Sequence, residues 1–493
     1  MIKKVLLLTT VFISTLGAYA QHDFTFKIDG IADTTMYLAN YFGGKMYYND
    51  TTVADANGVV RFKGKESKPG GIYAVIFPDN KTYFQVVVNE EKIVMETTIE
   101  NPEANMVVKV SEENKAFYAY LNFVTGVQKR MADLNNQKAQ EGANVKKIDA
   151  QIKEEQEKAE KFKADYLKKN EKLFAAKVLS TSDEINVPEF KKEDGSKDDQ
   201  KRFKYYRDHY FDNVDLKDDR LLRTPVLNQK IETYLTKLTP QVPDSICATV
   251  QYLTSQTASD TSLMYKYIIQ YTTNTFEKSD IMGMDGVFVC IAENYYAEGK
   301  AWWVEDDKLD EILKMYNTRK NLLIGQKAEN IVLMDVDSNW KSLYDIKAKY
   351  TVIVFWDPNC GHCKKEMPKL QEFYKENKSK GVEVYAVSTE FDNKDWPAFI
   401  KEQGYSWIDV SDNPEINKNA HKYILEGKTT LNSLNFRDYW DIFSTPQFYL
   451  LDENKVIIAK KINAEQMPDF IKQYETRKAA EAEEAEKEKK SKK

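Results

Sequence analysis

After its first twenty residues the chain continues in short runs in which apolar and polar residues alternate. The runs FTFKIDG from Phe24 and TMYLANYF from Thr35 show this period of two most clearly. Turn residues separate the runs, and Asn57-Gly58 before VVRF is a strong signal for a tight hairpin turn. Alternation with hairpin signals at this spacing predicts a small antiparallel β-domain over residues 21–110.

The pattern then changes to a helical period. Residues 111–176 are rich in Lys, Glu, Gln and Ala, contain no proline and space their apolar side chains as a helix does. This predicts one long charged helix or a helical hairpin, with the charges forming a solvated face. Residues 177–323 continue in the same style with prolines between the segments, which predicts a helical domain.

The last third of the chain alternates continuous apolar runs with helical segments. The runs YTVIVFW, VEVYAVST and QFYLL have the length and composition of buried strands. Strands that alternate with helices predict an α/β domain over residues 324–475. The final residues, 476–493, form a charged tail that is either a frayed helix or disordered. The predicted fold class is therefore multidomain, with an antiparallel β-domain, a helical middle region and a C-terminal α/β domain.

The N-terminus carries the three parts of an export signal. Lys3 and Lys4 precede an apolar run over residues 5–16, and small residues stand at Ala18 and Ala20. We expect the first twenty residues to be a signal peptide, cleaved after Ala20, and the mature protein to be periplasmic. A permanent membrane anchor needs about 20 apolar residues, and this run is too short. We therefore expect no stable membrane insertion after cleavage.

The charge balance narrows the possible partners. The chain has 71 basic and 77 acidic residues, for a net charge of -6. This near balance shows no basic footprint of the kind that binds nucleic acid, so we expect no nucleic-acid partner.

The candidate catalytic residues lie in the segment YTVIVFWDPNCGHCKKEMPKL. It places Cys360 and Cys363 directly after a predicted strand, at the start of a helix. Unpaired backbone N–H groups at a helix N-terminus stabilise a thiolate, so Cys360 is the predicted nucleophile. Cys363 lies three residues on, on the same face, and can resolve a mixed disulfide. His362 can donate a hydrogen bond or a positive charge to the Cys360 thiolate, which makes the disulfide more oxidising.

Three other uses of the motif fit the sequence less well. A zinc site needs two more ligands, but the other histidines and cysteines are isolated positions. A c-type haem site needs His directly after Cys363, where Lys364 stands. A purely structural disulfide with so short a loop hardly constrains the unfolded chain. We therefore expect a redox disulfide and neither a metal nor a cofactor.

The same segment resembles the thioredoxin superfamily, and more narrowly its exported TlpA/ResA-like branch. The resemblance covers about residues 324–474, and the domains ahead of it are similar to multidomain exported thioredoxins of Bacteroidetes-type bacteria. It implies nucleophilic and resolving roles for the two cysteines and a helix-kinking role for Pro368. It also implies that Thr445-Pro446 is the cis-proline loop facing the disulfide. There an extended substrate can pair with exposed backbone.

Two further expectations concern side chains around the motif. Glu366 matches the carboxylate of the ResA-like branch, which can relay protons to the buried cysteine, although an ordinary exposed helix glutamate is the alternative. We expect Trp356, together with the cis-proline loop, to contact substrate. Val354 stands where thioredoxins proper carry a buried Asp, which leaves Glu366 as the candidate base. Asn359 stands where many thioredoxins carry Trp, which bears on substrate preference.

The remaining cysteines, Cys247 and Cys290, each lie in an apolar helical segment. Buried free thiols are the common use of such cysteines, and a bridge between the two is the alternative in an exported chain.

Two functions remain open at this stage. The leading hypothesis is a thiol-disulfide oxidoreductase that exchanges disulfides with protein thiols and draws on a membrane electron donor or acceptor. The rival is a non-enzymatic periplasmic binding or assembly protein whose thioredoxin-like domain is a passive redox clamp. More than two thirds of the chain lies outside that domain, which keeps the rival open.

Overall fold

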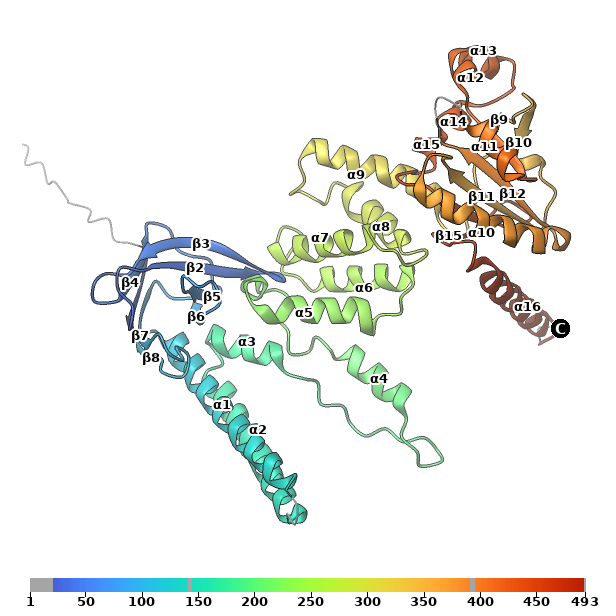
Figure 1. The fold of residues 1–493 in the computed structure, drawn as a ribbon. Coiled ribbons are helices and arrows are strands. Elements are labelled where there is room, and N and C mark those ends of the chain that lie inside the picture. Colours follow the sequence, from blue (N-terminus) through green and yellow to red (C-terminus); the bar gives the residue numbers. More distant parts are fainter. Residues whose placement is uncertain (1–20, 141–143, 391–394, 492–493) are drawn as a thin grey trace, which may run out of the picture. The chain divides into compact units, whose positions relative to one another are not determined.

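A computed structural model gives the fold of the protein (Figure 1). The chain divides into two compact units. One unit comprises the residues up to Leu238 together with Gln256–Tyr265. The other comprises Thr239–Ser255 and the residues from Lys266 onward. The predicted signal peptide lies outside the residues that the structure describes. Those residues are 21–140, 144–390 and 395–491.

Eight strands form two four-stranded sheets in the first unit. The strand orders are β4-β1-β7-β8 and β3-β2-β5-β6. All neighbours are antiparallel except β1 and β7, which run parallel, so the prediction of an antiparallel domain is wrong for that pair. The pairing joins strands far apart in the chain, which local alternation cannot reveal. The strands are β1 (His22–Asp29), β2 (Thr35–Phe42), β3 (Lys45–Val53), β4 (Val59–Gly64), β5 (Gly71–Ile76), β6 (Tyr83–Val88), β7 (Lys92–Thr98) and β8 (Val107–Val110).

The sequence explains most of these strands. β1 buries every second residue, as the alternation of its side chains requires. The turn before β4 needs glycine: Gly58 has a φ of +73°, and a Cβ there would lie 2.3 Å from the Ile28 carbonyl oxygen. Sequence analysis missed β3, which is largely exposed and carries no apolar period.

Helices occupy the middle of the chain. The predicted charged segment forms two long helices, α1 and α2, which contact each other along their length. Ser111 begins α1 by accepting a hydrogen bond from the Asn114 N–H. The helices and helical turns are α1 (Glu112–Lys138), α2 (Val145–Lys169), α3 (Phe174–Ser182), α4 (Asp199–Asp208), η1 (Asp219–Arg223), α5 (Pro225–Thr233), η2 (Tyr234–Leu238), α6 (Pro243–Ser255), α7 (Leu263–Glu277), α8 (Asp285–Ile291), η3 (Ala292–Tyr296), α9 (Asp306–Arg319) and η4 (Lys320–Leu322).

A seven-stranded mixed sheet forms the core of the C-terminal domain, in the order β10-β9-β13-β12-β11-β14-β15. The strands β11, β12 and β13 are parallel neighbours, and β14 runs antiparallel to β11. All seven residues of β11 are buried, as its continuous apolar run predicts. The strands are β9 (Val332–Met334), β10 (Trp340–Ser342), β11 (Tyr350–Trp356), β12 (Val382–Ser388), β13 (Ile408–Ser411), β14 (Gln447–Leu451) and β15 (Ile457–Lys460).

Apolar clusters cover both faces of this sheet, and α10 packs on one of them. Pro368 lies inside α10, where it removes one backbone donor. The charged tail continues α16 up to Ser491. The remaining helices and turns are η5 (Leu343–Asp345), α10 (Gly361–Asn377), η6 (Lys378–Lys380), α11 (Trp396–Gln403), α12 (Pro414–Lys418), α13 (Ala420–Leu425), α14 (Leu431–Leu434), α15 (Phe436–Tyr439) and α16 (Met467–Ser491).

Within the second unit, polar contacts join the late helices to this sheet. Lys460 at the end of β15 is 5% exposed, forms an ion pair with Asp285 of α8, and donates to the Leu322 carbonyl at 2.6 Å. Arg319 at the end of α9 donates to Asp441 at 2.8 Å. A buried ion pair therefore holds α8 against the C-terminal domain, and a partly buried one holds α9.

Candidate active site

The two cysteines of the motif lie where a buried strand turns into a helix. β11 ends at Trp356, and Cys360 is the N-terminal cap residue of α10. Asp357 shapes the turn between them: its side chain accepts the Asn359 N–H at 2.7 Å and its carbonyl accepts the Cys360 N–H at 3.1 Å. This geometry directs the first backbone N–H groups of α10 toward the first cysteine.

The two thiols have opposite environments. Both are free, Cys360 is half-buried and Cys363 is 1% exposed. Partial burial raises the pKa of Cys360, but hydrogen bonds to Thr445 and to the backbone N–H groups of Cys363 and His362 outweigh it and leave the pKa below its ordinary value. Burial raises the pKa of Cys363 to about 12. The first cysteine is thus poised to be a thiolate and the second to stay protonated.

The cis-proline loop faces the first cysteine. The Thr445–Pro446 peptide bond is cis, and the Cys360 thiol donates to the Thr445 carbonyl at 3.3 Å. A cavity of about 760 Å³ opens beside this contact. Its lining includes His362, Thr445, Pro446 and Phe443, whose side chain is 78% exposed. The predicted loop residues and His362 therefore lie around one opening.

Glu366 lies on the same cavity wall, one helical turn after Cys363. One carboxylate oxygen accepts from Lys369 at 2.9 Å, and the other is buried with no hydrogen-bond partner among the described residues. The side chain is 24% exposed, which excludes the fully exposed alternative. No hydrogen bond joins Glu366 to Cys363 in the described part of the chain.

His362 and Trp356 differ from their predicted surroundings. The His362 side chain is exposed, and its ring makes no hydrogen bond among residues that the structure describes; the backbone N–H of His362 acts on Cys360 instead. Trp356 is 0% exposed, and its ring packs against Phe399 and Tyr405. The prediction that Trp356 contacts substrate is therefore at odds with its burial, because the side chain faces the core beneath α10.

Sequence reasoning missed a buried acid behind the site. Asp409 on β13 is 5% exposed, and burial raises its pKa to about 8. The signal was present as a carboxyl residue between Ile408 and Val410, but a four-residue strand does not reveal which of its residues face α10.

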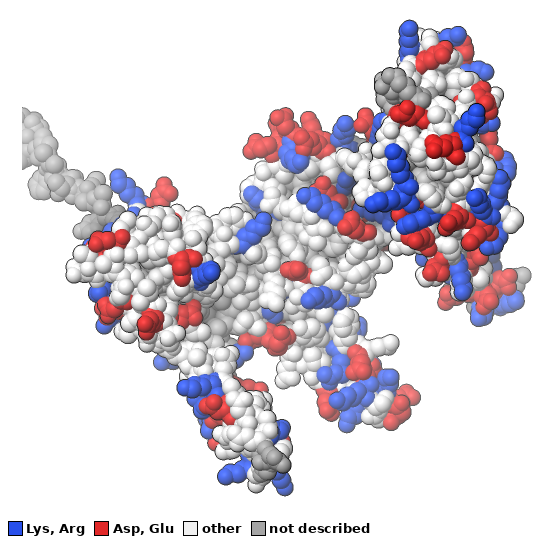
Figure 2. All heavy atoms as spheres, viewed as in Figure 1, with Lys and Arg blue, Asp and Glu red and all other residues white. Residues whose placement is uncertain are grey.

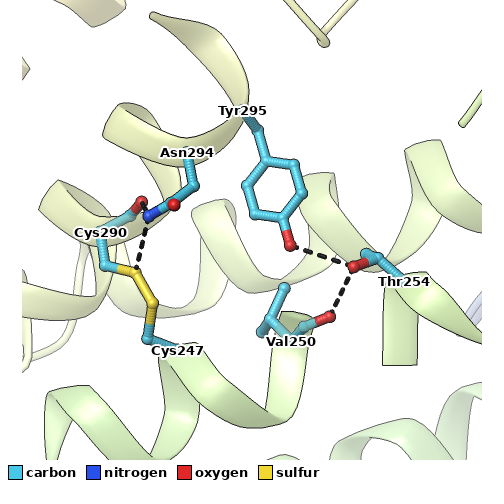
Figure 3. Close-up of a disulfide and its surroundings, with 6 residues drawn as sticks. All are labelled: Cys247, Val250, Thr254, Cys290, Asn294 and Tyr295. Atoms are coloured by element: carbon cyan, nitrogen blue, oxygen red, sulfur yellow. Dashed lines mark hydrogen bonds between the residues drawn. A yellow bond between two sulfur atoms is a disulfide. The ribbon is translucent and has the colours of Figure 1, made fainter. Parts of the chain in front are cut away.

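The other two cysteines form a disulfide between α6 and α8 (Figure 3). Cys247 and Cys290 are half-buried, with Cα atoms 6.3 Å apart. The Asn294 side chain donates to the Cys290 carbonyl at 2.8 Å and contacts its sulfur at 3.4 Å. Of the two possibilities that the sequence left open, the structure has the bridge.

Two general properties of the described residues bear on function. None of their helices combines the length and apolar character needed to cross a bilayer, and they hold no group of three or more His, Cys, Asp or Glu placed to bind a metal. Figure 2 shows basic and acidic side chains interspersed over the visible face rather than gathered by sign.

Comparison with known families divides the chain into three segments. Residues 324–460 match the AhpC/TSA family, residues 135–321 match a domain of unknown function (DUF5106), and residues 24–117 match another (DUF4369).

Similar proteins cluster around the C-terminal segment. The thiol-disulfide oxidoreductase ResA of Bacillus thuringiensis is 36% identical over 72 residues, which are 15% of this chain and 42% of that protein. ResA of Bacillus cereus is 24% identical over 160 residues, or 32% of this chain and 80% of that protein. The solved domain of a possible thiol-disulfide isomerase from Cytophaga hutchinsonii is 37% identical, covers 32% of this chain and 97% of that domain, and has a TM-score of 0.28.

The AhpC/TSA match, over residues 324–460, covers the strands of the mixed sheet together with Cys360 and Cys363. The chain spans less than half the length of the first of these relatives. The C-terminal part of the chain is a thioredoxin-like domain of the AhpC/TSA type, similar to thiol-disulfide oxidoreductases of the ResA kind.

Proposed function

We propose that the protein is an exported thiol-disulfide oxidoreductase that exchanges disulfides with protein substrates through Cys360 and Cys363. The observation that carries the proposal is the contrast between the two thiols. Cys360 is accessible with a lowered pKa, whereas Cys363 is buried with a raised one. This is the division of labour that a nucleophile and a resolving thiol require.

The proposed reaction uses the two thiols in turn. In reduction, the Cys360 thiolate attacks one sulfur of a substrate disulfide, a mixed disulfide forms, and the other substrate sulfur leaves as a thiolate. Cys363 then loses its proton and attacks Cys360, which forms the Cys360–Cys363 bond and releases the second substrate sulfur. In oxidation the same steps run in reverse. The direction is set by the potential of the partner, and a membrane electron donor or acceptor would restore the dithiol or disulfide.

The substrate is an extended segment of a protein. The cavity beside Thr445 and Pro446 has a size typical of ligand sites, and the exposed ring of Phe443 offers it an apolar contact. Backbone groups of the cis-proline loop would pair with the segment as an added strand does. His362 would stabilise the thiolate after a side-chain rotation, and Glu366 would assist proton movement from the cavity wall.

The protein would work in the periplasm, with the first twenty residues as a signal peptide cleaved after Ala20. A redox site of this kind needs thiols and disulfides as partners, and an exported compartment supplies them.

The test uses the mature full-length protein and a fluorescent peptide disulfide. We expect exchange in the wild type and its loss in Cys360→Ser. The matched control is the double variant Cys247→Ser/Cys290→Ser, which removes the other two sulfur atoms and should exchange normally. Undiminished exchange in Cys360→Ser would overturn the proposal.

A second candidate is the binding or assembly protein. It is favoured by β3, a nine-residue strand at the edge of its sheet that exposes Tyr47 and Tyr48. An open strand edge can accept a strand from a partner. This candidate predicts that a partner recovered with the wild type is recovered equally with a variant lacking both Cys360 and Cys363.

A further inference from the structure

The loop that faces the nucleophilic thiol is tied to a helix outside the thioredoxin-like domain. Residues 441–446, which we call the facing loop, include Thr445, whose carbonyl accepts from the Cys360 thiol at 3.3 Å. At the other end of the loop, a carboxylate oxygen of Asp441 accepts from Nε of Arg319 at 2.8 Å. Arg319 is the last residue of α9 and lies in the segment that matches DUF5106. A segment of unknown function thus contacts the loop beside the dithiol.

The ion pair between this helix and the loop is sheltered from water. The Arg319 side chain is 13% exposed and the Asp441 side chain is 19% exposed. The guanidinium also lies over the Phe288 ring of α8, 5.1 Å from the ring centroid. A planar guanidinium that is bonded to a carboxylate and stacked on a ring is fixed in orientation, and solvent screens a partly buried pair less than an exposed one. The contact therefore holds Asp441 in place relative to α8 and α9.

The backbone of Asp441 has a conformation that needs such a restraint. Its φ is +52°, in the left-handed region that residues other than glycine adopt rarely. Its N–H donates to the Asp438 carbonyl at 3.3 Å, and the Ile442 N–H donates to the Arg437 carbonyl at 3.0 Å. Residues in sparsely populated conformations persist where the surrounding structure holds them, and they gather at sites that clamp ligands.

Few contacts restrain the rest of the facing loop. Its base is closed by the Trp440 carbonyl, which accepts from the Gln447 side chain at 3.1 Å. Gln447 is the first residue of β14 and is fixed by the sheet. Between the two ends, Phe443 and Ser444 are exposed, and neither makes a hydrogen bond among the described residues. The position of Thr445 therefore depends on how the two ends of the loop are held.

We propose that Arg319 positions the facing loop for substrate binding, so that α9 sets how well the dithiol receives a polypeptide. Through Asp441 it holds the loop where the Thr445 carbonyl meets Cys360 and where the neighbouring backbone can pair with an extended segment. No hydrogen bond joins Arg319 to either free cysteine in the described structure, so it is a positioning residue. The inference rests on the proposed function and gives the helical region a part in it.

Other contacts keep the helical region in place when this pair is removed. Lys460 of β15 remains paired with Asp285 and bonded to the Leu322 carbonyl. Lys461 donates to the Ser279 carbonyl at 2.6 Å. Loss of the Arg319 guanidinium should therefore free the facing loop rather than detach α8 and α9 from the domain.

The size of the substrate separates the effect of the loop from that of the thiols. A peptide disulfide is aligned by backbone pairing with the facing loop, so a displaced loop misplaces its sulfur. Bis(2-hydroxyethyl) disulfide has no backbone to pair, and its reaction depends on the Cys360 thiolate at the start of α10. The position of the loop should therefore affect the first reaction and leave the second nearly unchanged.

The test compares these two disulfides on the mature full-length protein. Reduced protein is mixed with an excess of a fluorescent peptide disulfide or of bis(2-hydroxyethyl) disulfide, and the ratio of the two second-order rate constants is the selectivity for a polypeptide. Arg319→Met keeps an apolar side chain of similar length against Phe288 and removes the guanidinium. It should lower the peptide rate constant by about 10-fold, with the small disulfide within about twofold of wild type.

Asp441→Gly permits the same φ but removes the carboxylate, so it separates the ion pair from the backbone conformation and serves if Arg319→Met fails to fold. Its selectivity should fall to the same extent. The double variant should lose no more than either single variant, because all three remove one contact. Lys320→Ala is the matched control: it removes the neighbouring cation, whose contacts among the described residues are with Asn317 and Tyr316, and should keep wild-type selectivity.

Three results would overturn the inference. They are a selectivity within about twofold of wild type in folded Arg319→Met or Asp441→Gly, an equal loss with both disulfides, and losses that add in the double variant. A wild type that reacts with neither disulfide would instead overturn the proposed function.

Discussion

The chain contains two pairs of cysteines within one compact unit, and the structure uses them differently. Cys247 and Cys290 come from two packed helices, 43 positions apart, and are bridged. Cys360 and Cys363 lie in one helical turn and are free thiols with displaced pKa values. What separates them is the environment: one pair faces a neighbouring helix, whereas the other faces a helix N-terminus, a cis-proline loop and a cavity. Sulfur proximity therefore does not by itself indicate redox chemistry.

The largest effect is expected when the attacking sulfur of Cys360 is removed. Cys360→Ser should lower the rate of disulfide exchange by at least about 1,000-fold, because no other described thiol is both accessible and acidified. The rate with a peptide disulfide measures the loss. If the exchange rate falls instead in Cys247→Ser/Cys290→Ser, the reactive pair is Cys247 and Cys290, which contradicts the proposed function.

For stability the order of the two pairs should be reversed: the Cys247–Cys290 bridge should contribute more to the free energy of unfolding than Cys360 and Cys363 do. Closing a loop of this length restricts the unfolded chain, so Cys247→Ser/Cys290→Ser should reduce the free energy of unfolding by about 2–4 kcal/mol. Chemical denaturation, with both proteins kept under oxidising conditions, measures the difference. A Cys360→Ser/Cys363→Ser variant closes no long loop and should change the value by less; equal losses would contradict the distinction.

The two free thiols should also differ in the pH at which they react with an alkylating reagent. Alkylation of Cys360 by iodoacetamide should reach half its maximal rate at a pH below the ordinary thiol value of 9.0, because hydrogen bonds favour the thiolate. In Cys360→Ser the remaining Cys363 should resist alkylation at pH 8, because its pKa is about 12 and it is buried. Mass spectrometry across the pH range assigns each site. Rapid labelling of Cys363 at neutral pH would argue against its burial.

The smallest effect concerns His362. If its side chain turns toward the Cys360 thiolate, His362→Ala should destabilise the dithiol by about 1.4 kcal/mol and lower the reduction potential by about 30 mV. Equilibration of the full-length protein with glutathione buffers provides the measurement. An unchanged potential would confine the contribution of this residue to its backbone N–H, which alanine retains.

The sequence predicts the parts of the fold that local patterns specify. Strand β11 was expected from a continuous apolar run, and a dithiol after it requires only the order strand, turn, helix. The parallel pairing of β1 with β7 was not expected, because it depends on contacts between distant segments. Strand β3 was missed because its side chains face solvent and its pairing is made by the backbone.

The site shows the same limit. The spacing of the motif indicates which cysteine attacks and which resolves. Trp356 was expected to contact substrate but is buried, because the sequence does not show which face of the sheet a residue at a strand end joins. Asp409 was overlooked for the same reason: its position opposite Ala386 follows from strand register, which is a property of the folded sheet.

The buried contact of Lys460 has a consequence for the modularity of the chain. Its partners, Asp285 and the Leu322 carbonyl, both precede the family match that begins at residue 324. Cutting the chain at that boundary would remove both partners of the Lys460 ammonium and uncover the end of β15 that they cover. A C-terminal segment that begins at residue 324 should therefore be less stable than one that also includes α8 and η4.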